Sequence, residues 1–106
     1  MKNIEQQLID NFKRYVAISS QSDGSVMTLP SSEGQRTLAK LLCDDLNSLG
    51  YQETELLESG IALVRLPGNL PDAKKIGFIA HLDTVDVGLS QIFIHKSCAT
   101  KAHHFA

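Results

Sequence analysis

His81 and Asp83 are the two residues of this sequence whose types and spacing could do chemistry. Because residues i and i+2 of an extended chain point to the same side, both side chains would face one common space. A neutral imidazole is a good zinc ligand, and a nearby carboxylate can fix the tautomer of that ligand. The pair therefore indicates a metal site with His81 as the ligand. A His-x-Asp spacing also arises by chance, so an incidental pair is the alternative interpretation.

The residues before this pair must position it. Lys75–Ala80 is a compact apolar run with Gly77 inside it, too short for a helix and typical of a strand buried on both faces. In open α/β sheets, ligands bind beyond the carboxyl ends of the strands. The sequence thus predicts a strand over 75–80, with His81 at its C-terminal end. Asp86 lies nearby and is expected to be a solvated surface carboxylate.

A first helix is predicted over residues 4–18. Asn3 can act as its N-cap, and Gln6 occupies the position of a capping-box partner. Its apolar side chains recur at helical spacing, namely Ile4, Leu8, Phe12 and Tyr15. Ser19–Pro30 then lacks periodicity and is expected to be a connecting loop.

A second helix is predicted over residues 33–49. Ser32 and Gln35 fit a capping box at its start, and Gly50 is placed as a terminating glycine. One face of this helix is made of leucines. Cys43 flanks that face, which favours a packed thiol over a reactive one.

A β-hairpin is predicted after the second helix. Tyr51–Glu58 and Ile61–Leu66 are short runs joined by Ser59-Gly60, a plausible two-residue turn because glycine tolerates positive φ. The element order is then helix, helix, hairpin and buried strand. This order predicts an α/β or α+β core.

Composition and charge exclude several classes of protein. The chain has 106 residues, 42% of them hydrophobic and 21% charged, which indicates at most one ordinary globular domain. Its net charge of −2 provides no basic excess for a phosphate backbone, so no nucleic-acid partner is expected. The N-terminus lacks the apolar region of a signal peptide, and no apolar stretch approaches the roughly 20 residues that span a bilayer. A cytoplasmic protein with no membrane partner and reduced cysteines is therefore expected.

Three segments carry a resemblance to a known family. They are Tyr15-Val16 with Ser22, then Pro-Ser-Ser-Glu-Gly-Gln at 30–35, then Ile-Gly-Phe-Ile-Ala-His-Leu-Asp-Thr at 76–84. Together they resemble the start of peptidase T, from about Asn3 to about Ser90. His-x-Asp-Thr is shared with deacylases and carboxypeptidases, whereas the 30–35 segment is similar to peptidase T in particular.

This resemblance implies a fold, an activity and a cofactor. Peptidase T is a cytoplasmic di-zinc aminopeptidase that removes the N-terminal residue of tripeptides. Residues 1–90 would be the N-terminal portion of its α/β catalytic domain, with an incomplete sheet. His81 matches the first zinc ligand, and Asp83 matches the catalytic aspartate that orients it. The family's bridging aspartate, glutamate general base and remaining ligands lie far downstream of His81, so the 106 residues alone are expected to be inactive.

Residues 91–106 depart from the family pattern. They hold three of the four histidines, His95, His103 and His104, together with Cys98. The spacing of these residues matches no known zinc-finger pattern, and adjacent histidines cannot easily chelate one ion from a regular backbone. A divergent, disordered tail is therefore expected, as translation out of frame or a prematurely ended gene would produce.

Two functions from different classes compete on this evidence. One is zinc-dependent tripeptide hydrolysis by an enzyme whose N-terminal part is this sequence. The other is a small noncatalytic α/β interaction module in which His81 and Asp83 are incidental. The sequence leaves the tripeptide preference and the oligomeric state open.

Overall fold

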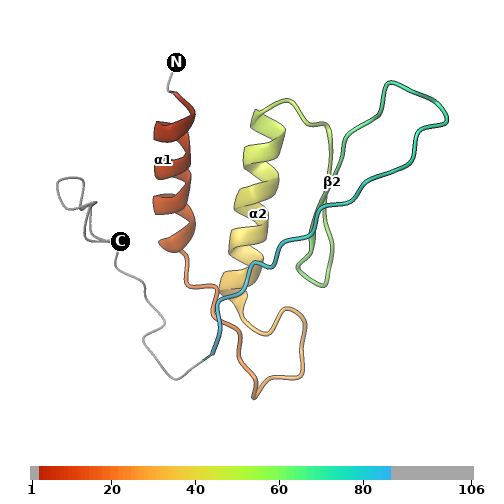
Figure 1. Cartoon of the computed structure of the whole chain (residues 1–106). Coiled ribbons are helices and arrows are strands. Elements are labelled where there is room, and N and C mark those ends of the chain that lie inside the picture. Colours follow the sequence, from red (N-terminus) through yellow and green to blue (C-terminus); the bar gives the residue numbers. More distant parts are fainter. Residues whose placement is uncertain (1–2, 87–106) are drawn as a thin grey trace, which may run out of the picture.

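The computed structural model describes residues 3–86. Along this part of the chain, two helices precede a two-stranded antiparallel sheet: α1 (Ile4–Val16), α2 (Glu33–Ser48), β1 (Glu53–Leu56) and β2 (Ala62–Arg65). Figure 1 shows α2 between α1 and the hairpin. The two predicted helices and the hairpin are confirmed. Among the described residues, no helix has the length and apolar character needed to cross a bilayer.

Helix α1 begins at the predicted cap. The Asn3 side chain accepts a hydrogen bond from the backbone N–H of Gln6 at 2.7 Å. The Gln6 side chain donates to Asp10 at 2.9 Å, so it does not close the predicted capping box. The helix ends at Val16, two residues before the predicted end at 18. No residue of α1 is fully buried: Ile4, Leu8 and Phe12 of its apolar stripe are exposed, and Tyr15 is half-buried.

Helix α2 ends at Ser48, one residue before the predicted end at 49, and Gly50 is its terminating glycine as predicted. The N–H of Tyr51 donates to the Leu46 carbonyl at 3.1 Å, and the N–H of Gly50 donates to the Asn47 carbonyl at 3.0 Å. These two bonds form a Schellman motif, which requires the φ of +98° that Gly50 adopts. At the other end, Ser32 is the N-cap residue, but its side chain makes no capping bond to the backbone. Its hydroxyl lies 3.1 Å from Gln35 Nε2, so the predicted capping box is not formed.

The hairpin turn is one residue longer than predicted. The N–H of Gly60 donates to the Leu57 carbonyl at 2.9 Å, and the N–H of Leu57 donates to the Ile61 carbonyl at 2.8 Å. The loop therefore holds the three residues 58–60, with Gly60 at a φ of +89°. A tight turn followed by a left-handed glycine is the usual form of a three-residue hairpin loop.

The core of the described part is small and centred on α2. Its buried apolar residues are Leu38, Ala39 and Cys43. The Sγ of Cys43 lies 3.8 Å from the Glu55 carbonyl oxygen, and burial raises the pKa of this thiol. Cys43 is thus a packed thiol, as predicted.

Residues 75–80 differ from the prediction of a buried strand. The structure assigns them no strand, and the side chains of Ile76, Phe78 and Ile79 are almost fully exposed. A strand exists through the neighbours that pair with its backbone. Within residues 3–86, β1 and β2 pair only with each other, so neither accepts residues 75–80. The predicted α/β sheet is therefore represented by one antiparallel hairpin.

Candidate metal site

The structure brings the two predicted site residues into contact. The Nδ1 atom of His81 lies 2.8 Å from the backbone carbonyl oxygen of Asp83 and 3.1 Å from its Oδ1. Both oxygens are acceptors, so the proton of a neutral imidazole belongs on Nδ1. The lone pair on Nε2 is then free to bind a metal ion. The His81 side chain is 85% exposed and that of Asp83 40%, so a ligand can reach both.

A short loop segment, Ser20–Ser22, holds the backbone on either side of Asp83; we call it the 20–22 strap. Gln21 and Thr84 form a parallel bridge, in which the N–H of Thr84 donates to the Ser20 carbonyl at 3.2 Å. The N–H of Ser22 donates to the Thr84 carbonyl at 3.0 Å. The Ser20 hydroxyl donates to the Leu82 carbonyl at 2.9 Å. The strap therefore fixes Leu82 and Thr84, the two neighbours of Asp83.

The strap is the most buried polar part of the described chain. Ser20 is 3% exposed and Gln21 8%. Asp86 is exposed, as expected for a surface carboxylate, and its Oδ1 also accepts a hydrogen bond from Gln21 Nε2 at 3.0 Å. Buried polar groups normally have partners because an unpaired one costs free energy. Two buried polar atoms, Gln21 Oε1 and Thr84 Oγ1, have no hydrogen-bond partner among the residues the structure describes.

Sequence reasoning placed the strap in an unstructured loop and missed its role. The signal available was the alternation of Ser20 and Ser22, which an extended segment presents on one side. Gly34, near the start of α2, allows the close approach of this segment. A Cβ on Gly34 would overlap the Ser19 carbonyl oxygen.

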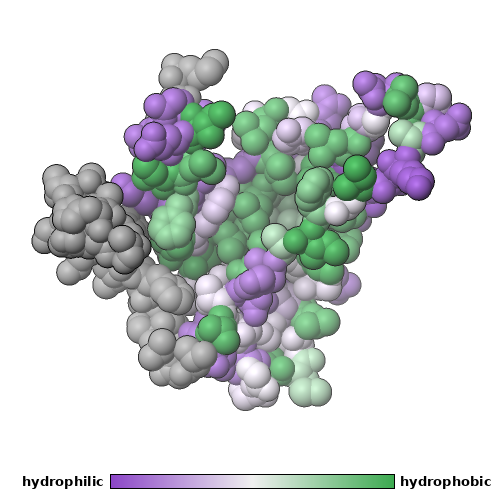
Figure 2. Space-filling view, in the orientation of Figure 1, coloured by the Kyte–Doolittle hydropathy of each residue, from purple (hydrophilic) through white to green (hydrophobic). Residues whose placement is uncertain are grey.

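A cleft of about 770 Å³ lies between the helices, the hairpin turn and the segment that carries His81. Its walls include Arg14, Gln35, Leu46, Ile61, His81 and Asp83. Figure 2 shows hydrophobic side chains spread across this face, from α1 over α2 to the hairpin. The candidate metal site therefore lies at the edge of a largely apolar hollow.

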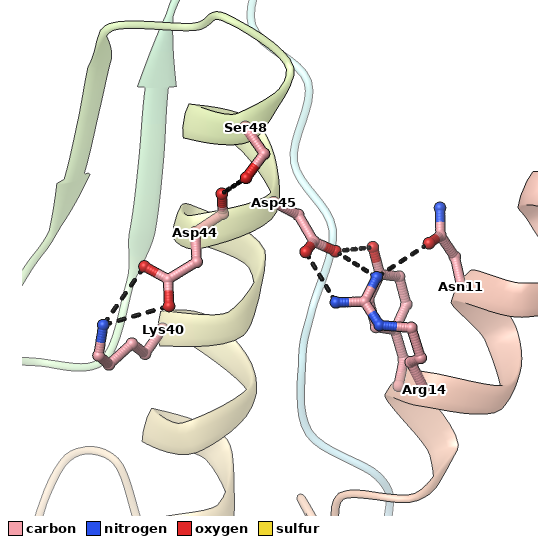
Figure 3. A network of polar contacts seen from close by, with 7 residues as sticks. Asn11, Arg14, Lys40, Asp44, Asp45 and Ser48 are labelled. Atoms are coloured by element: carbon pink, nitrogen blue, oxygen red, sulfur yellow. Dashed lines mark hydrogen bonds and ion pairs between the residues drawn. The ribbon is translucent and has the colours of Figure 1, made fainter. Parts of the chain in front are cut away.

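One polar cluster joins the two helices that form the cleft (Figure 3). Both terminal nitrogens of Arg14 donate to the carboxylate of Asp45, at 2.8 and 3.0 Å. The Tyr15 hydroxyl donates to the same carboxylate at 3.1 Å. The hydrogen bond from Arg14 is the main reason that the pKa of Asp45 lies below its ordinary value. The pKa of Tyr15 is raised, chiefly by burial and then by its bond to Asp45.

The described residues contain one partial set of metal ligands. A catalytic zinc normally has three protein ligands. Within residues 3–86, no group of three or more His, Cys, Asp or Glu side chains could hold a metal ion together. His81 and Asp83 can supply one ligand and the carboxylate that orients it. The tail residues Cys98, His95, His103 and His104 lie outside the described part, as does the predicted tail 91–106.

Comparison with known proteins identifies relatives of this chain, although no family model matches it. It is 49% identical over 87 residues to a peptidase T-like protein of Yersinia pestis, an alignment that covers 82% of this chain and 21% of the relative. It is 46% identical over 79 residues to peptidase T of Aeromonas hydrophila, an alignment that covers 74% of this chain and 19% of that protein. It is 43% identical over 82 residues to peptidase T of Bacillus subtilis strain 168, an alignment that covers 76% of this chain and 20% of that protein.

These relatives place the chain among sequences related to bacterial peptidases. Over about four fifths of its length, the chain is homologous to peptidase T. It spans about a fifth of the length of the curated relatives it matches. The resemblance found in the sequence is thereby confirmed.

Proposed function

We propose that residues 3–86 are the part of a peptidase T-type metallo-aminopeptidase that supplies one zinc ligand, His81, and its orienting carboxylate, Asp83. The observation that carries this proposal is the contact of His81 Nδ1 with Asp83, which leaves Nε2 free. In the complete enzyme, the reaction is release of the N-terminal residue of a tripeptide. Peptide substrates, zinc and a cytoplasmic location come to this chain from its homology with peptidase T.

The donor chemistry of the site fits zinc. Imidazole nitrogen is among the usual zinc ligands, and ligating histidines almost always donate their other N–H to a carboxylate or a carbonyl. His81 Nδ1 faces both kinds of acceptor, each provided by Asp83. When bound, zinc polarises the carbonyl group of the peptide bond that is cleaved. The part of Asp83 is to hold the imidazole in one tautomer and orientation, and the 20–22 strap keeps Asp83 in place.

The test uses a chimaera in which residues 3–86 replace the matching region of Bacillus subtilis peptidase T. We expect His81→Ala to abolish tripeptide hydrolysis and to lower the zinc content of the purified protein, because a ligand to the metal is lost. Asp83→Ala should reduce activity by at least about 10–100-fold, the usual cost of removing a carboxylate that orients a metal-bound histidine. Activity is measured by release of the N-terminal amino acid, and zinc by elemental analysis.

Asp72→Ala is the matched control, since it removes an exposed carboxylate that lies outside the cleft. This variant should keep both its zinc and its activity. Near-normal activity of His81→Ala or Asp83→Ala would show that the proposed role of that residue is wrong.

A noncatalytic interaction module is the second candidate function. The observation that favours it is the large exposed apolar surface of the described part, which includes Leu8, Phe12 and Phe78. The nucleotide sequence downstream of the codon for Ala106, translated in all frames, separates the two candidates. Further peptidase T motifs there would support the enzyme, and their absence would support the module.

A further inference from the structure

Ser20 holds both of the peptide groups that flank Asp83. Its hydroxyl donates to the carbonyl of Leu82, in the peptide group before Asp83, at 2.9 Å. Its own carbonyl accepts a hydrogen bond from the N–H of Thr84, in the peptide group after Asp83, at 3.2 Å. Peptide groups are planar, so the φ and ψ of a residue are the angles between the two groups on either side of it. One serine therefore constrains both backbone dihedrals of Asp83.

The second of these bonds also sets the direction of the Asp83 carbonyl. In a trans peptide group, such as this one, the C=O and the N–H lie in one plane and point in opposite directions. Ser20 accepts the N–H of Thr84 on one side, so the carbonyl of Asp83 is turned to the other side. His81 Nδ1 lies there, 2.8 Å from the carbonyl oxygen. Ser20 and His81 thus contact opposite ends of the same peptide group.

Helix α2 gives Ser20 a fixed position. Ser20 is buried, so solvent competes poorly for its hydroxyl. Its Cα lies 3.5 Å from the place that a Cβ on Gly34 would take, and the carbonyl of Ser19 lies still closer to that place. Since Gly34 belongs to the first turn of α2, the serine rests directly on this helix. Groups supported by regular elements orient a site more precisely than groups in free loops.

Ser22, in the same strap, makes a bond of a different kind. Its hydroxyl donates to the Thr84 carbonyl at 3.2 Å, and its backbone N–H donates to the same oxygen at 3.0 Å. That carbonyl belongs to the peptide group after Thr84, which does not flank Asp83. The hydroxyl of Ser22 therefore duplicates a backbone bond, whereas the bond from Ser20 to Leu82 is made by the hydroxyl alone.

We propose that Ser20 is a positioning residue for His81. By holding the two peptide groups around Asp83, it aims the acceptors of Asp83 at Nδ1 and leaves Nε2 as the free nitrogen. Both acceptors, the carbonyl oxygen and Oδ1, turn with the backbone of Asp83. The role of His81 as a zinc ligand comes from the proposed function, on which this inference rests. The placing of the imidazole by Ser20 can be measured without zinc.

Nitrogen-15 NMR of the metal-free 106-residue protein, labelled at histidine, tests this inference, because the ring nitrogens report which of them carries the proton. Spectra are recorded at about pH 8.5, about two units above the ordinary histidine pKa, so that the imidazole is neutral. His81→Ala identifies the signals of His81 by their loss. In the wild type, the Nδ1–H form should be the main tautomer. Ser20→Ala should lower the ratio of the Nδ1–H to the Nε2–H form about threefold, within the usual effect of losing one hydrogen bond.

Ser22→Ala is the matched control, because it removes a hydroxyl from the same strap while the backbone bond to the Thr84 carbonyl remains. It should leave the tautomer ratio at its wild-type value. Ser20→Thr keeps the hydroxyl and should also retain that ratio, which separates the hydrogen bond from the mere presence of serine. Circular dichroism checks that each variant keeps its helices.

Three outcomes would overturn the inference. The first is a wild type in which Nε2–H is the main form, or a ratio that Ser20→Ala leaves unchanged. The second is an equal fall of the ratio in Ser22→Ala or in Ser20→Thr. The third is loss of the helices in Ser20→Ala, which would assign Ser20 to folding.

Failure of the proposed function would give a different result. In the Bacillus subtilis chimaera, His81→Ala would then keep its zinc, while Ser20→Ala would still change the tautomer ratio in the metal-free protein. In that case the zinc role of His81 is wrong, and the positioning of its imidazole by Ser20 stands.

Discussion

Asp45 is the residue through which helix α1 is joined to helix α2. It accepts two hydrogen bonds from Arg14 and one from the Tyr15 hydroxyl, and its side chain is 24% exposed. Since no residue of α1 is buried, apolar packing contributes little to holding this helix. The orientation of α1 therefore depends on this one carboxylate more than on its apolar stripe.

We predict that Asp45→Asn lowers the urea concentration at which the protein unfolds, as measured by circular dichroism. The amide cannot form the same paired bonds with a guanidinium group. The folded-state pKa of Asp45 is depressed, so its stabilising contribution is complete above the unfolded-state pKa of about 4. That contribution is lost as the pH falls through the lower folded-state pKa. The difference in unfolding urea concentration between wild type and variant should thus be constant from about pH 5 to 7. It should shrink in more acidic buffer.

Asp44→Asn is the control for this prediction. Asp44 is the neighbouring carboxylate, and its ion pair with Lys40 lies within α2, with both side chains more than half exposed. Exposed pairs of this kind contribute little to stability. An equal loss in both variants would show that the Asp45 cluster does not join the helices.

Among the larger elements, the contact of the Ser19–Ser22 loop with α2 positions the candidate site. Gly34 makes this contact possible, because a Cβ there would overlap the Ser19 carbonyl. We predict that Gly34→Ala destabilises the protein by about 1–2 kcal/mol, although alanine is the better helix former by about 1 kcal/mol. The measurement is urea unfolding, together with hydrogen exchange at the N–H of Thr84, which should become faster as the strap is displaced.

Gly24→Ala provides the comparison, since a Cβ at Gly24 would have no atom within 4 Å. It should leave the exchange of the Thr84 N–H unchanged. A Gly34→Ala protein that is more stable than wild type would mean that helix propensity outweighs the contact with Ser19.

The elements that were predictable from sequence are those with local signals. Asn3 and Gly50 mark helix ends through bonds to residues only three to five positions away, so the sequence near each one is sufficient. The bridge between Gln21 and Thr84 joins residues more than sixty positions apart, and no local pattern specifies it. The strand predicted over residues 75–80 failed for the same reason, because a compact apolar run does not supply a pairing partner.

The candidate site likewise contains residues that local spacing predicts and residues that only the folded chain reveals. His81 and Asp83 were predictable because their spacing alone brings them together. The strap was not, because Ser20 and Gln21 resemble ordinary loop residues until the chain returns beside them. Their burial, at 3% and 8% exposed, is a property of the folded chain.

Taken as a whole, the described part exposes much apolar surface around a partial ligand set. Phe12, Phe78 and Ile79 are among its exposed large side chains. The cleft beside His81 is open to this surface, so water is poorly excluded from it. Catalysis of peptide hydrolysis needs a metal held by several ligands and a general base. Within residues 3–86, only His81 and its partner Asp83 have been assigned to such a centre.

We therefore predict that the purified 106-residue protein has no tripeptidase activity above the buffer blank, even with added zinc, and that it binds zinc weakly. One imidazole nitrogen cannot hold a catalytic zinc that normally takes three protein ligands. The assay runs beside the chimaera that completes the chain with the rest of Bacillus subtilis peptidase T, under the same zinc and tripeptide concentrations. Zinc affinity is measured by isothermal titration calorimetry. Turnover by the short protein comparable to that of the chimaera would contradict this prediction, and it would point to additional ligands, with His95, His103 and His104 the first to replace by alanine.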